Sequence, residues 1–217
     1  MTSKKNILSI ETSSNICGVS FISKGVCIET IEEGSKKKHA EILPDFYSKL
    51  KNITGFILDD IDAIAISIGP GSFTGLRIGL SFAKGLAYSK DLPIIPISTM
   101  MSLAYSLKDS RPYKGIIYSH AKRVFLQDIK WQKEIPYPGS DIEVYEWEEV
   151  FEYINNVKNV FQLNCEVLNK ENSFIEANLS SSYVGLLASI NYNKLVIDKP
   201  YDLVPNYVSP FVVKKKK

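Results

Sequence analysis

The chain has 217 residues, of which 45% are hydrophobic and 23% are charged, enough for one large domain or two small lobes around a buried core. Its formal net charge of +2 at pH 7 is too weak to indicate nucleic-acid binding by itself, although lysines cluster at 36–38 and 214–217. Three cysteines without zinc or redox spacing, and no secretory or membrane-length apolar run, predict a cytoplasmic protein with reduced thiols and no membrane partner.

The N-terminal part predicts three strands and a helix. Strands are expected at residues 7–10, 18–23 and 26–31, joined by short turns as in an antiparallel meander. A helix with a wide apolar stripe follows at 39–52. Pro44 lies inside it, which predicts either a kink or a helix start close to residue 39.

Glycines cluster where a strand near Ile64 runs into the next helix, in the sequence ISIGPGSFTGLRIG. Gly69, Gly71 and Gly75 predict a tight turn, and either Ser72 or Thr74 is expected to cap the helix. Such a corner presents free backbone N–H groups at a positive helix end and is able to hold an anion, with Arg77 close by. The spacing matches neither a P-loop nor a dinucleotide fingerprint, so the alternative is a purely structural turn.

The helix after this corner, expected at 75–89, carries small residues every four positions. Gly75, Gly79, Ala83 and Ala87 form a ridge on which another backbone can pack closely. The other positions are also largely apolar, which is typical of a helix buried on more than one side. One side faces its own sheet; the other needs a cover from this chain or from a second protein.

The remaining elements complete an order of strands and helices that predicts an α/β layer fold. We expect a strand at 93–97 and a helix at 101–107, then strands at 115–118, 124–129 and 160–163, helices at 146–155 and 180–190, and a loop at 136–140.

No catalytic or metal-binding constellation stands out in the sequence. His39 and His120 share no metal-ligand spacing, and no serine lies in a Gly-x-Ser-x-Gly elbow. Cys17 has no feature of a nucleophile. Glu11 follows the first strand, where it is placed either to hold a metal ion or to form a turn before Thr12. We predict no catalytic residue and no metal ligand.

The glycine-rich segment at 68–79 and the residues AKGLAY at 83–88 resemble the signature of the TsaB (YeaZ) family. Further similarity lies in IETS at 10–13, HAEILP at 39–44 and DDID at 59–62. The similarity is close over about the first 105 residues and weak afterwards, where AKRVF at 121–125 resembles the start of a family strand.

This resemblance implies the ASKHA fold of actin, sugar kinases and heat-shock chaperones, with two ribonuclease-H-like lobes. We place the lobes at 1–107 and 108–217. Family members take part in forming N6-threonylcarbamoyladenosine at position 37 of tRNAs that read codons beginning with adenine. The transferase is a larger paralogue, TsaD, which pairs with the TsaB-like protein, and an ATPase, TsaE, joins the same assembly.

The resemblance also predicts a chain that is not an enzyme by itself. The transferase carries two metal-binding histidines, and the matching positions here are Thr99 and Leu103, neither of which supplies an imidazole. The phosphate turn usual for the fold, Asp-x-Gly, is degraded here to Glu11-Thr12-Ser13. Glu11 also departs from the family's usual aspartate. No intrinsic cofactor is expected, and a nucleotide is expected to bind only in the assembled complex.

We therefore expect a scaffold or activator subunit that docks on the TsaD-like paralogue, contacts tRNA through the complex, and pairs with itself when alone. The two helices at 39–52 and 75–89 are the expected docking face. Its candidate residues are His39, Leu43, Phe46, Tyr47, Gly75, Ile78, Gly79, Phe82 and Ala83. The alternatives are a free-standing ATP-dependent or metallopeptidase-like enzyme of the same fold, or direct tRNA binding through the lysine runs.

Overall fold

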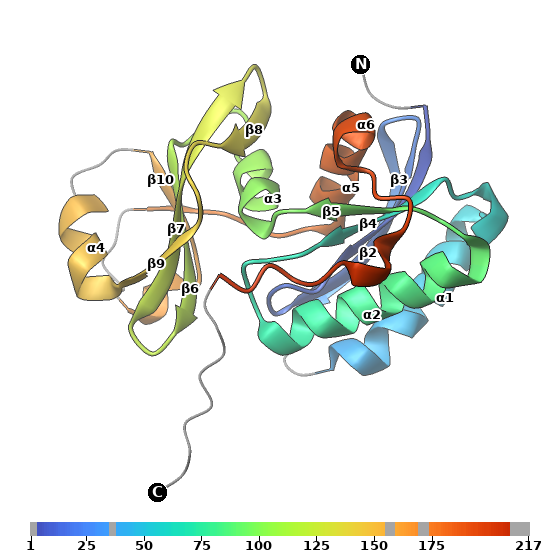
Figure 1. The fold of residues 1–217 in the computed structure, drawn as a ribbon, viewed down its shortest axis with the longest axis horizontal. Coiled ribbons are helices and arrows are strands. Elements are labelled where there is room, and N and C mark those ends of the chain that lie inside the picture. The colour runs from blue at the N-terminus through green and yellow to red at the C-terminus, as the bar shows by residue number, and fades with distance from the viewer. Residues whose placement is uncertain (1–3, 35–37, 155–158, 169–173, 209–217) are drawn as a thin grey trace, which may run out of the picture.

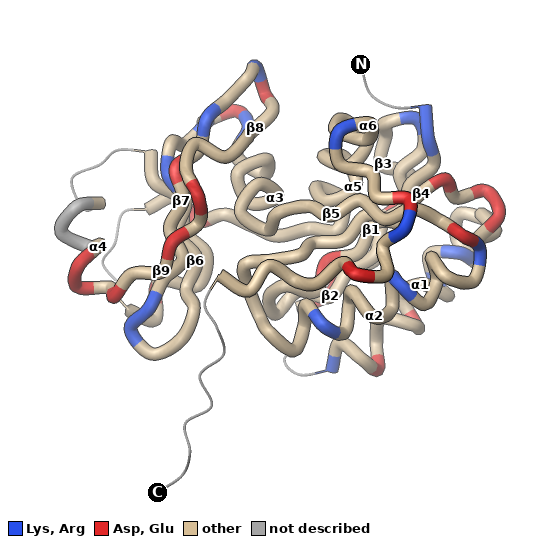
Figure 2. The backbone as a smooth tube through the Cα atoms, in the orientation of Figure 1, with Lys and Arg blue, Asp and Glu red and all other residues tan. Residues whose placement is uncertain are grey.

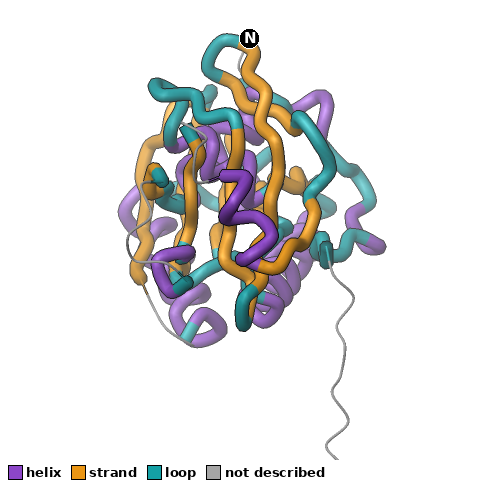
Figure 3. Tube along the Cα trace, turned by 90° about the vertical axis from the view of Figure 1, so that its left-hand side faces the viewer, coloured by secondary structure: helices purple, strands orange, loops and turns teal. Residues whose placement is uncertain are grey.

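The computed structural model describes residues 4–34, 38–154, 159–168 and 174–208. Two β-sheets lie side by side along the long axis of the molecule, each with helices packed on it (Figure 1). Figure 3, which faces the second sheet, shows its strands in front of the helices of the first. The α/β class and the ASKHA arrangement predicted from the sequence are confirmed. Within the described part of the chain, no helix is long and apolar enough to cross a membrane.

The first sheet has five strands in the order β3-β2-β1-β4-β5. Their bounds are Asn6–Glu11 (β1), Ile16–Ser23 (β2), Val26–Gly34 (β3), Ala63–Ser67 (β4) and Ile94–Ile97 (β5). β1, β2 and β3 form the predicted antiparallel meander, whereas β4 runs parallel to both β1 and β5. β1 and β4 are almost completely buried because helices cover both faces of the sheet.

Helices α1 and α2 cover one face of this sheet and α5 covers the other. The helices are His39–Thr54 (α1), Phe73–Lys90 (α2), Thr99–Ser106 (α3) and Ser181–Ile190 (α5). α1 packs mainly on β2 and β3, α2 on β4, and α5 on β1 and β2. α1 starts at His39, as one of the two interpretations of Pro44 expected, and stops at Gly55 in the left-handed conformation (φ 74°).

The second sheet has the order β11-β10-β6-β7-β8, with β9 also paired to β7. Its strands are Lys114–His120 (β6), Arg123–Gln132 (β7), Ile135–Pro138 (β8), Glu143–Glu146 (β9), Val160–Leu163 (β10) and Ile175–Glu176 (β11). Helix α4, Trp147–Ile154, packs beside β9, and the predicted helix end at residue 155 lies outside the described residues.

The loop predicted at 136–140 is wrong for residues 136–138, and only Gly139 and Ser140 lie in a loop. Pro136 and Tyr137 belong to β8, which pairs antiparallel with Trp131 and Lys130 of β7. β8 is an edge strand. Proline has no N–H to donate to a neighbouring strand, and at a sheet edge no such hydrogen bond is required. The prolines therefore mark the edge of a sheet here rather than a loop.

The C-terminal part of the chain returns to the first sheet. α5 is followed by a short helix α6, Tyr192–Leu195, and Ile197 then forms a bridge to Ile94 at the edge of β5. Asn206 donates its backbone N–H to the carbonyl of Ile68 at 2.7 Å. The predicted lobe boundary at 107/108 stays a prediction: the two sheets lie on either side of it, whereas α5 packs on the first sheet.

Candidate functional site at the glycine-rich corner

The corner between β4 and α2 is held in place by distant parts of the chain. Gly69 has φ 112°, a conformation closed to other residues, and is joined to Pro70 by a cis peptide bond. The carbonyl of Gly69 accepts the backbone N–H of Thr99 at 2.9 Å, while Asn206 binds Ile68 next to it. The tight turn predicted from the glycines is confirmed.

The corner lies directly against the turn between β1 and β2. Ser72 donates its backbone N–H to the carbonyl of Ser13 at 2.7 Å. A Cβ atom on Gly71 would overlap the carbonyl oxygen of Ser13, and one on Gly75 would overlap that of Thr12. The structure thus brings together two of the predicted groups, the glycine-rich corner and the degraded phosphate turn at residues 11–13.

Ser72 is the N-cap of α2, as one of the two sequence interpretations expected. Its Oγ accepts the backbone N–H of Gly75 at 3.2 Å, whereas Thr74 is exposed. Arg77 is exposed one turn later; its guanidinium lies 3.8 Å from the ring centroid of Phe73, and its Nε donates to the hydroxyl of Tyr207 at 2.9 Å. An anion at this helix end stays a prediction.

Replacing Ser72 with alanine should lower the free energy of unfolding by about 1 kcal/mol, because the first turn of α2 loses its side-chain acceptor. Chemical denaturation of both proteins measures this difference. Thr74→Ala is the matched control and should change stability by less than half as much. Equal losses for the two variants would show that Ser72 has no special role as a cap.

Glu11 is completely buried and holds the β1–β2 turn. Its Oε1 accepts both the backbone N–H and the hydroxyl of Ser13, each at 2.6 Å. Burial raises the pKa of Glu11 from 4.5 to about 7, the hydrogen bonds from Ser13 lower it, and the nearby carboxylate of Glu32 raises it. Of the two roles considered for Glu11, the structure shows the turn.

Buried hydroxyl groups gather where the parallel strands of the first sheet end. Their hydroxyl oxygens are buried, and in the described part of the chain no hydrogen-bond partner is found for the Oγ or Oγ1 atoms of Thr12, Ser98, Thr99 and Ser102. The hydroxyl of Ser67 lies beside Glu11 and lowers the pKa of that carboxyl by hydrogen bonding. The carboxyl ends of parallel strands are where α/β sheets bind ligands. Ser67 and Ser98 were not among the residues predicted from the sequence, although each is a serine at or just after the end of an apolar strand; Ser102 lies within α3.

The small-residue ridge of α2 packs inside the chain. Gly75 and Gly79 lie against Thr12, with Ile66 also beside Gly79, and Ala83 and Ala87 are buried. Among the predicted docking residues, His39, Leu43, Phe46, Gly75, Gly79 and Ala83 are buried, whereas Tyr47, Ile78 and Phe82 are only partly covered. A partner therefore has direct access only to the latter three, and docking itself stays a prediction.

The structure does not assemble a nucleophile or a metal centre from the candidates considered. His39 is buried, with its Nε2 3.1 Å from the carbonyl of Ile16, and His120 lies in the other sheet. Burial raises the pKa of Cys17 to about 12, so its thiol is protonated at neutral pH. In the described ranges, no three His, Cys, Asp or Glu side chains are grouped to hold a metal ion.

The chain is similar in sequence to proteins whose names refer to threonylcarbamoyladenosine formation on tRNA. The chain is 28% identical to the "tRNA threonylcarbamoyladenosine biosynthesis protein TsaB" of Haemophilus influenzae over 97% of this chain and 96% of that protein. It is 34% identical to a "tRNA N6-adenosine threonylcarbamoyltransferase" of Clostridium perfringens over 44% of this chain and 33% of that protein. Residues 30–122 match the family model "TsaD: tRNA N6-adenosine threonylcarbamoyltransferase".

Solved structures share the fold. A Pseudomonas aeruginosa protein described as similar to the peptidase YeaZ superposes with a TM-score of 0.80 at 21% identity, covering 94% of this chain and 100% of that chain. The activator of the 2-hydroxyisocaproyl-CoA dehydratase of Clostridium difficile superposes with a TM-score of 0.51 at 9% identity, covering 85% and 93%.

The two sheets, their helices and the corner between β4 and α2 define an α/β protein with the ASKHA fold predicted from the sequence. The similarity to the TsaB (YeaZ) family predicted from the sequence is confirmed, since the chain is similar to the TsaB protein of Haemophilus influenzae along nearly its whole length. The names of both relatives refer to threonylcarbamoyladenosine formation on tRNA.

Proposed function

We propose that this chain is a non-catalytic scaffold or activator subunit for N6-threonylcarbamoyladenosine formation, acting as a heterodimer with a TsaD-like transferase. Its relatives carry the names of this pathway, and part of the chain matches the transferase family itself. The observation that carries the proposal is the surface formed by α1 and α2. We call it the helix-pair face and define it by the partly covered residues Ile42, Tyr47, Ile78, Phe82 and Leu86.

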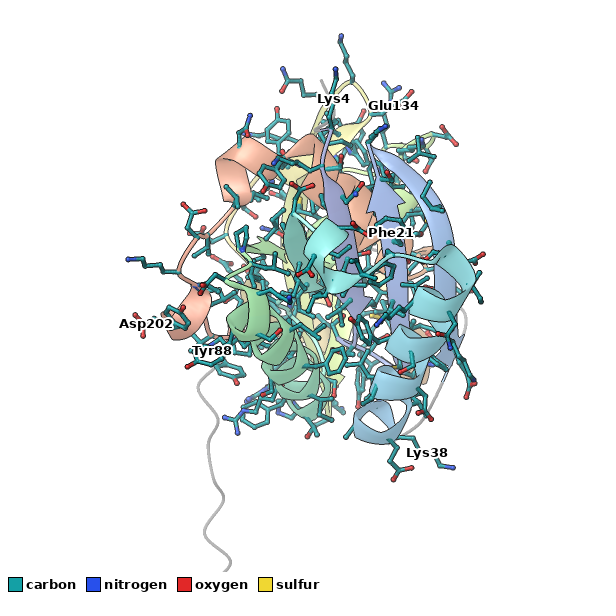
Figure 4. The ribbon with its side chains drawn as sticks, turned by 90° about the vertical axis from the view of Figure 1, so that its right-hand side faces the viewer. Lys4, Phe21, Lys38, Tyr88, Glu134 and Asp202 are labelled. Carbon is teal, nitrogen blue, oxygen red and sulfur yellow. The ribbon has the colours of Figure 1, made fainter. Side chains whose placement is uncertain are left out.

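The helix-pair face is suited to docking because two long helices lie next to each other with apolar side chains between and beside them. The rings of Tyr47 and Phe82 meet edge to face at 5.9 Å across the two helices. In Figure 4, α1 and α2 run together on the same side of the first sheet. Apolar residues that are left half covered on adjacent helices favour burial against another helical surface. The same face would allow self-pairing when the partner is absent.

The absence of catalysis is proposed from two positions. Thr99 and Leu103, which match the transferase's metal-binding histidines in the resemblance, are both buried in α3 and supply no nitrogen ligand. Glu11 already accepts two hydrogen bonds from Ser13, so its Oε1 is used by the fold. We propose that a nucleotide, a TsaE-like ATPase and tRNA are engaged only in the assembled complex.

Co-elution of this protein with the TsaD-like paralogue from the same source tests the proposal. Size-exclusion chromatography with light scattering should give a new peak at the mass of a heteromer, and the mixture should form threonylcarbamoyladenosine faster than the transferase alone. Two separate peaks of folded proteins would contradict the docking role. ATP hydrolysis by the isolated chain, or RNA binding that falls steeply with salt, would support the alternative functions.

A substitution on the helix-pair face should separate docking from folding. Ile78→Glu should weaken the heteromer by about tenfold or more, because a charged group is then buried without a partner at the interface. Titration calorimetry measures the dissociation constant. Val167→Glu is the matched control, since Val167 is 63% exposed near the second sheet, and it should bind as the unmodified protein does. Equal weakening by both variants would contradict the location of the interface.

A further inference from the structure

The two edge strands of the first sheet differ in whether another segment of the chain pairs with their outer side. At one edge, Ile94 of β5 exchanges backbone hydrogen bonds with Ile197 at 3.0 and 2.9 Å, so the strand is covered by the chain's own C-terminal part. At the other edge lies β3, which pairs only with β2 in the described part of the chain. An uncovered strand edge presents backbone groups that are able to pair with another extended chain.

The free edge of β3 is regular over residues 29–34. A register shift opposite Phe21 and Ile22 leaves Ile28 as an extra residue, and from Glu29 onward the pairing with β2 is continuous. The backbone N–H of Thr30 points away from β2, because it is bonded to the carboxylate of Glu29 at 2.9 Å. By the alternation of an antiparallel ladder, the N–H of Glu32 points outward as well.

The two faces of this edge differ in chemistry. Thr30 and Glu32 lie on the α5 face: Thr30 bonds Ser20, and Glu32 accepts the hydroxyl of Ser180 at 2.9 Å and the N–H of Ser181 at 3.1 Å. Glu29, Ile31 and Glu33 therefore lie on the α1 face, where Ile31 packs on the core beneath α1. In the described ranges neither Glu29 nor Glu33 forms an ion pair.

A groove runs along this face between β3 and the C-terminal half of α1. It has a volume of about 540 Å³ and reaches the free edge of β3, since its lining comprises residues 29–32 of β3 together with Lys49, Asn52 and Ile53 of α1. Ile53 is 64% exposed at its rim. Figure 4 views this side, with the labelled Lys38 at the start of α1, and Figure 2 shows where acidic and basic residues lie along the chain.

We propose that β3 is a docking edge for an extended segment of a partner protein that carries basic, apolar and basic side chains at alternate positions. Side chains of the added strand would lie beside Glu29, Ile31 and Glu33, so the two basic groups meet the glutamates and the apolar group meets Ile31. On binding, the carboxylate of Glu29 exchanges its hydrogen bond with the N–H of Thr30 for an ion pair with the incoming cation. The N–H of Thr30 then donates to a backbone carbonyl of the added strand. A second copy of this chain is disfavoured, because antiparallel pairing of two β3 strands brings glutamates together.

The peptide Thr-Arg-Thr-Val-Thr-Arg-Thr tests the proposal on the full chain, with Thr-Glu-Thr-Val-Thr-Glu-Thr as its charge-reversed counterpart. Amide chemical shifts from nitrogen-15 spectra should move at Thr30 and Glu32 with the arginine peptide, and its dissociation constant should be about tenfold lower than that of the glutamate peptide. Shifts that avoid β3, or equal affinity for both peptides, would overturn the proposal.

Two variants locate the binding on β3. Glu29→Lys should abolish the preference between the two peptides, because the new lysine and the remaining Glu33 act in opposite senses, whereas Asp109→Lys, an exposed change in the turn after α3, should leave it as it is. Thr30→Pro removes the outward N–H and should abolish binding while the remaining spectrum stays that of the folded protein. Retained preference for the arginine peptide in Glu29→Lys would exclude the edge. None of these readouts depends on the transferase, so they are independent of the proposed function.

Discussion

Replacing Gly75 with alanine should lower the free energy of unfolding by about 3 kcal/mol. The added Cβ would overlap the backbone carbonyl oxygen of Thr12, and neither the start of α2 nor the end of β1 is free to move away. Gly75 lies in the first turn of α2, so the overlap also loosens the contact between the corner and the β1–β2 turn. For a chain of this size the loss corresponds to a Tm lower by about 10 °C, measurable by calorimetry.

The same substitution on the same helix gives the control. Gly85 has nothing within 4 Å of a built Cβ, so Gly85→Ala should raise stability by about 0.5–1 kcal/mol through its better helix propensity. Opposite signs at the two positions would show that α2 is anchored through its small residues. If Gly75→Ala is as stable as Gly85→Ala, then the ridge does not pack against Thr12 as the structure shows.

Replacing Glu11 with glutamine should remove a pH dependence of stability. The folded-state pKa of Glu11 is about 7 against 4.5 for an unburied group, so the folded state binds the proton more tightly. Stability from this group is fully present below about pH 4.5 and is lost as the pH rises towards 7 and above. The loss is on the order of 3 kcal/mol between pH 4.5 and 8, and Glu11→Gln should not show it.

Denaturation of both proteins at several pH values measures the difference. Other titrating groups are shared by the two proteins, so their contributions cancel. The groups that face Glu11 are Ser13 in the turn, Ser67 on β4, Cys17 on β2 and Glu32 on β3; burial keeps the thiol protonated in this range. Glu41→Gln, an exposed change on α1, is the control and should follow the unmodified protein. A constant difference between pH 4.5 and 8 would contradict a buried, proton-binding Glu11.

The first half of the fold was predictable because its signals are local. Alternating apolar residues indicated β1 to β4, and glycines followed by Ser72 indicated the corner and the start of α2. The missed elements depend on pairing with another strand instead. β8 and β9 are strands only because both pair with β7, and β11 has two residues that pair with β10.

The candidate site was predicted in its parts but not in its assembly. Glycine spacing gave the corner, yet its contacts with Ser13 and Asn206 join residues far apart in sequence. The small residues of α2 were recognised as a surface on which another segment packs closely. Periodicity alone does not tell whether that segment belongs to this chain or to a second protein. In the structure it is the chain's own β1–β2 turn at Thr12.

The place of α5 has a consequence for how the protein is made. Residues 181–190 form a layer on a sheet whose first strand is residues 6–11, so that layer is synthesised last. A ribosome working at roughly 5–20 residues per second leaves one face of the nascent sheet uncovered for about 6–25 s after its central strands have emerged. A nascent chain stalled before residue 181 should therefore be digested readily by protease. A chain that contains α5 and extends to residue 208 should resist digestion once it has been released from the ribosome.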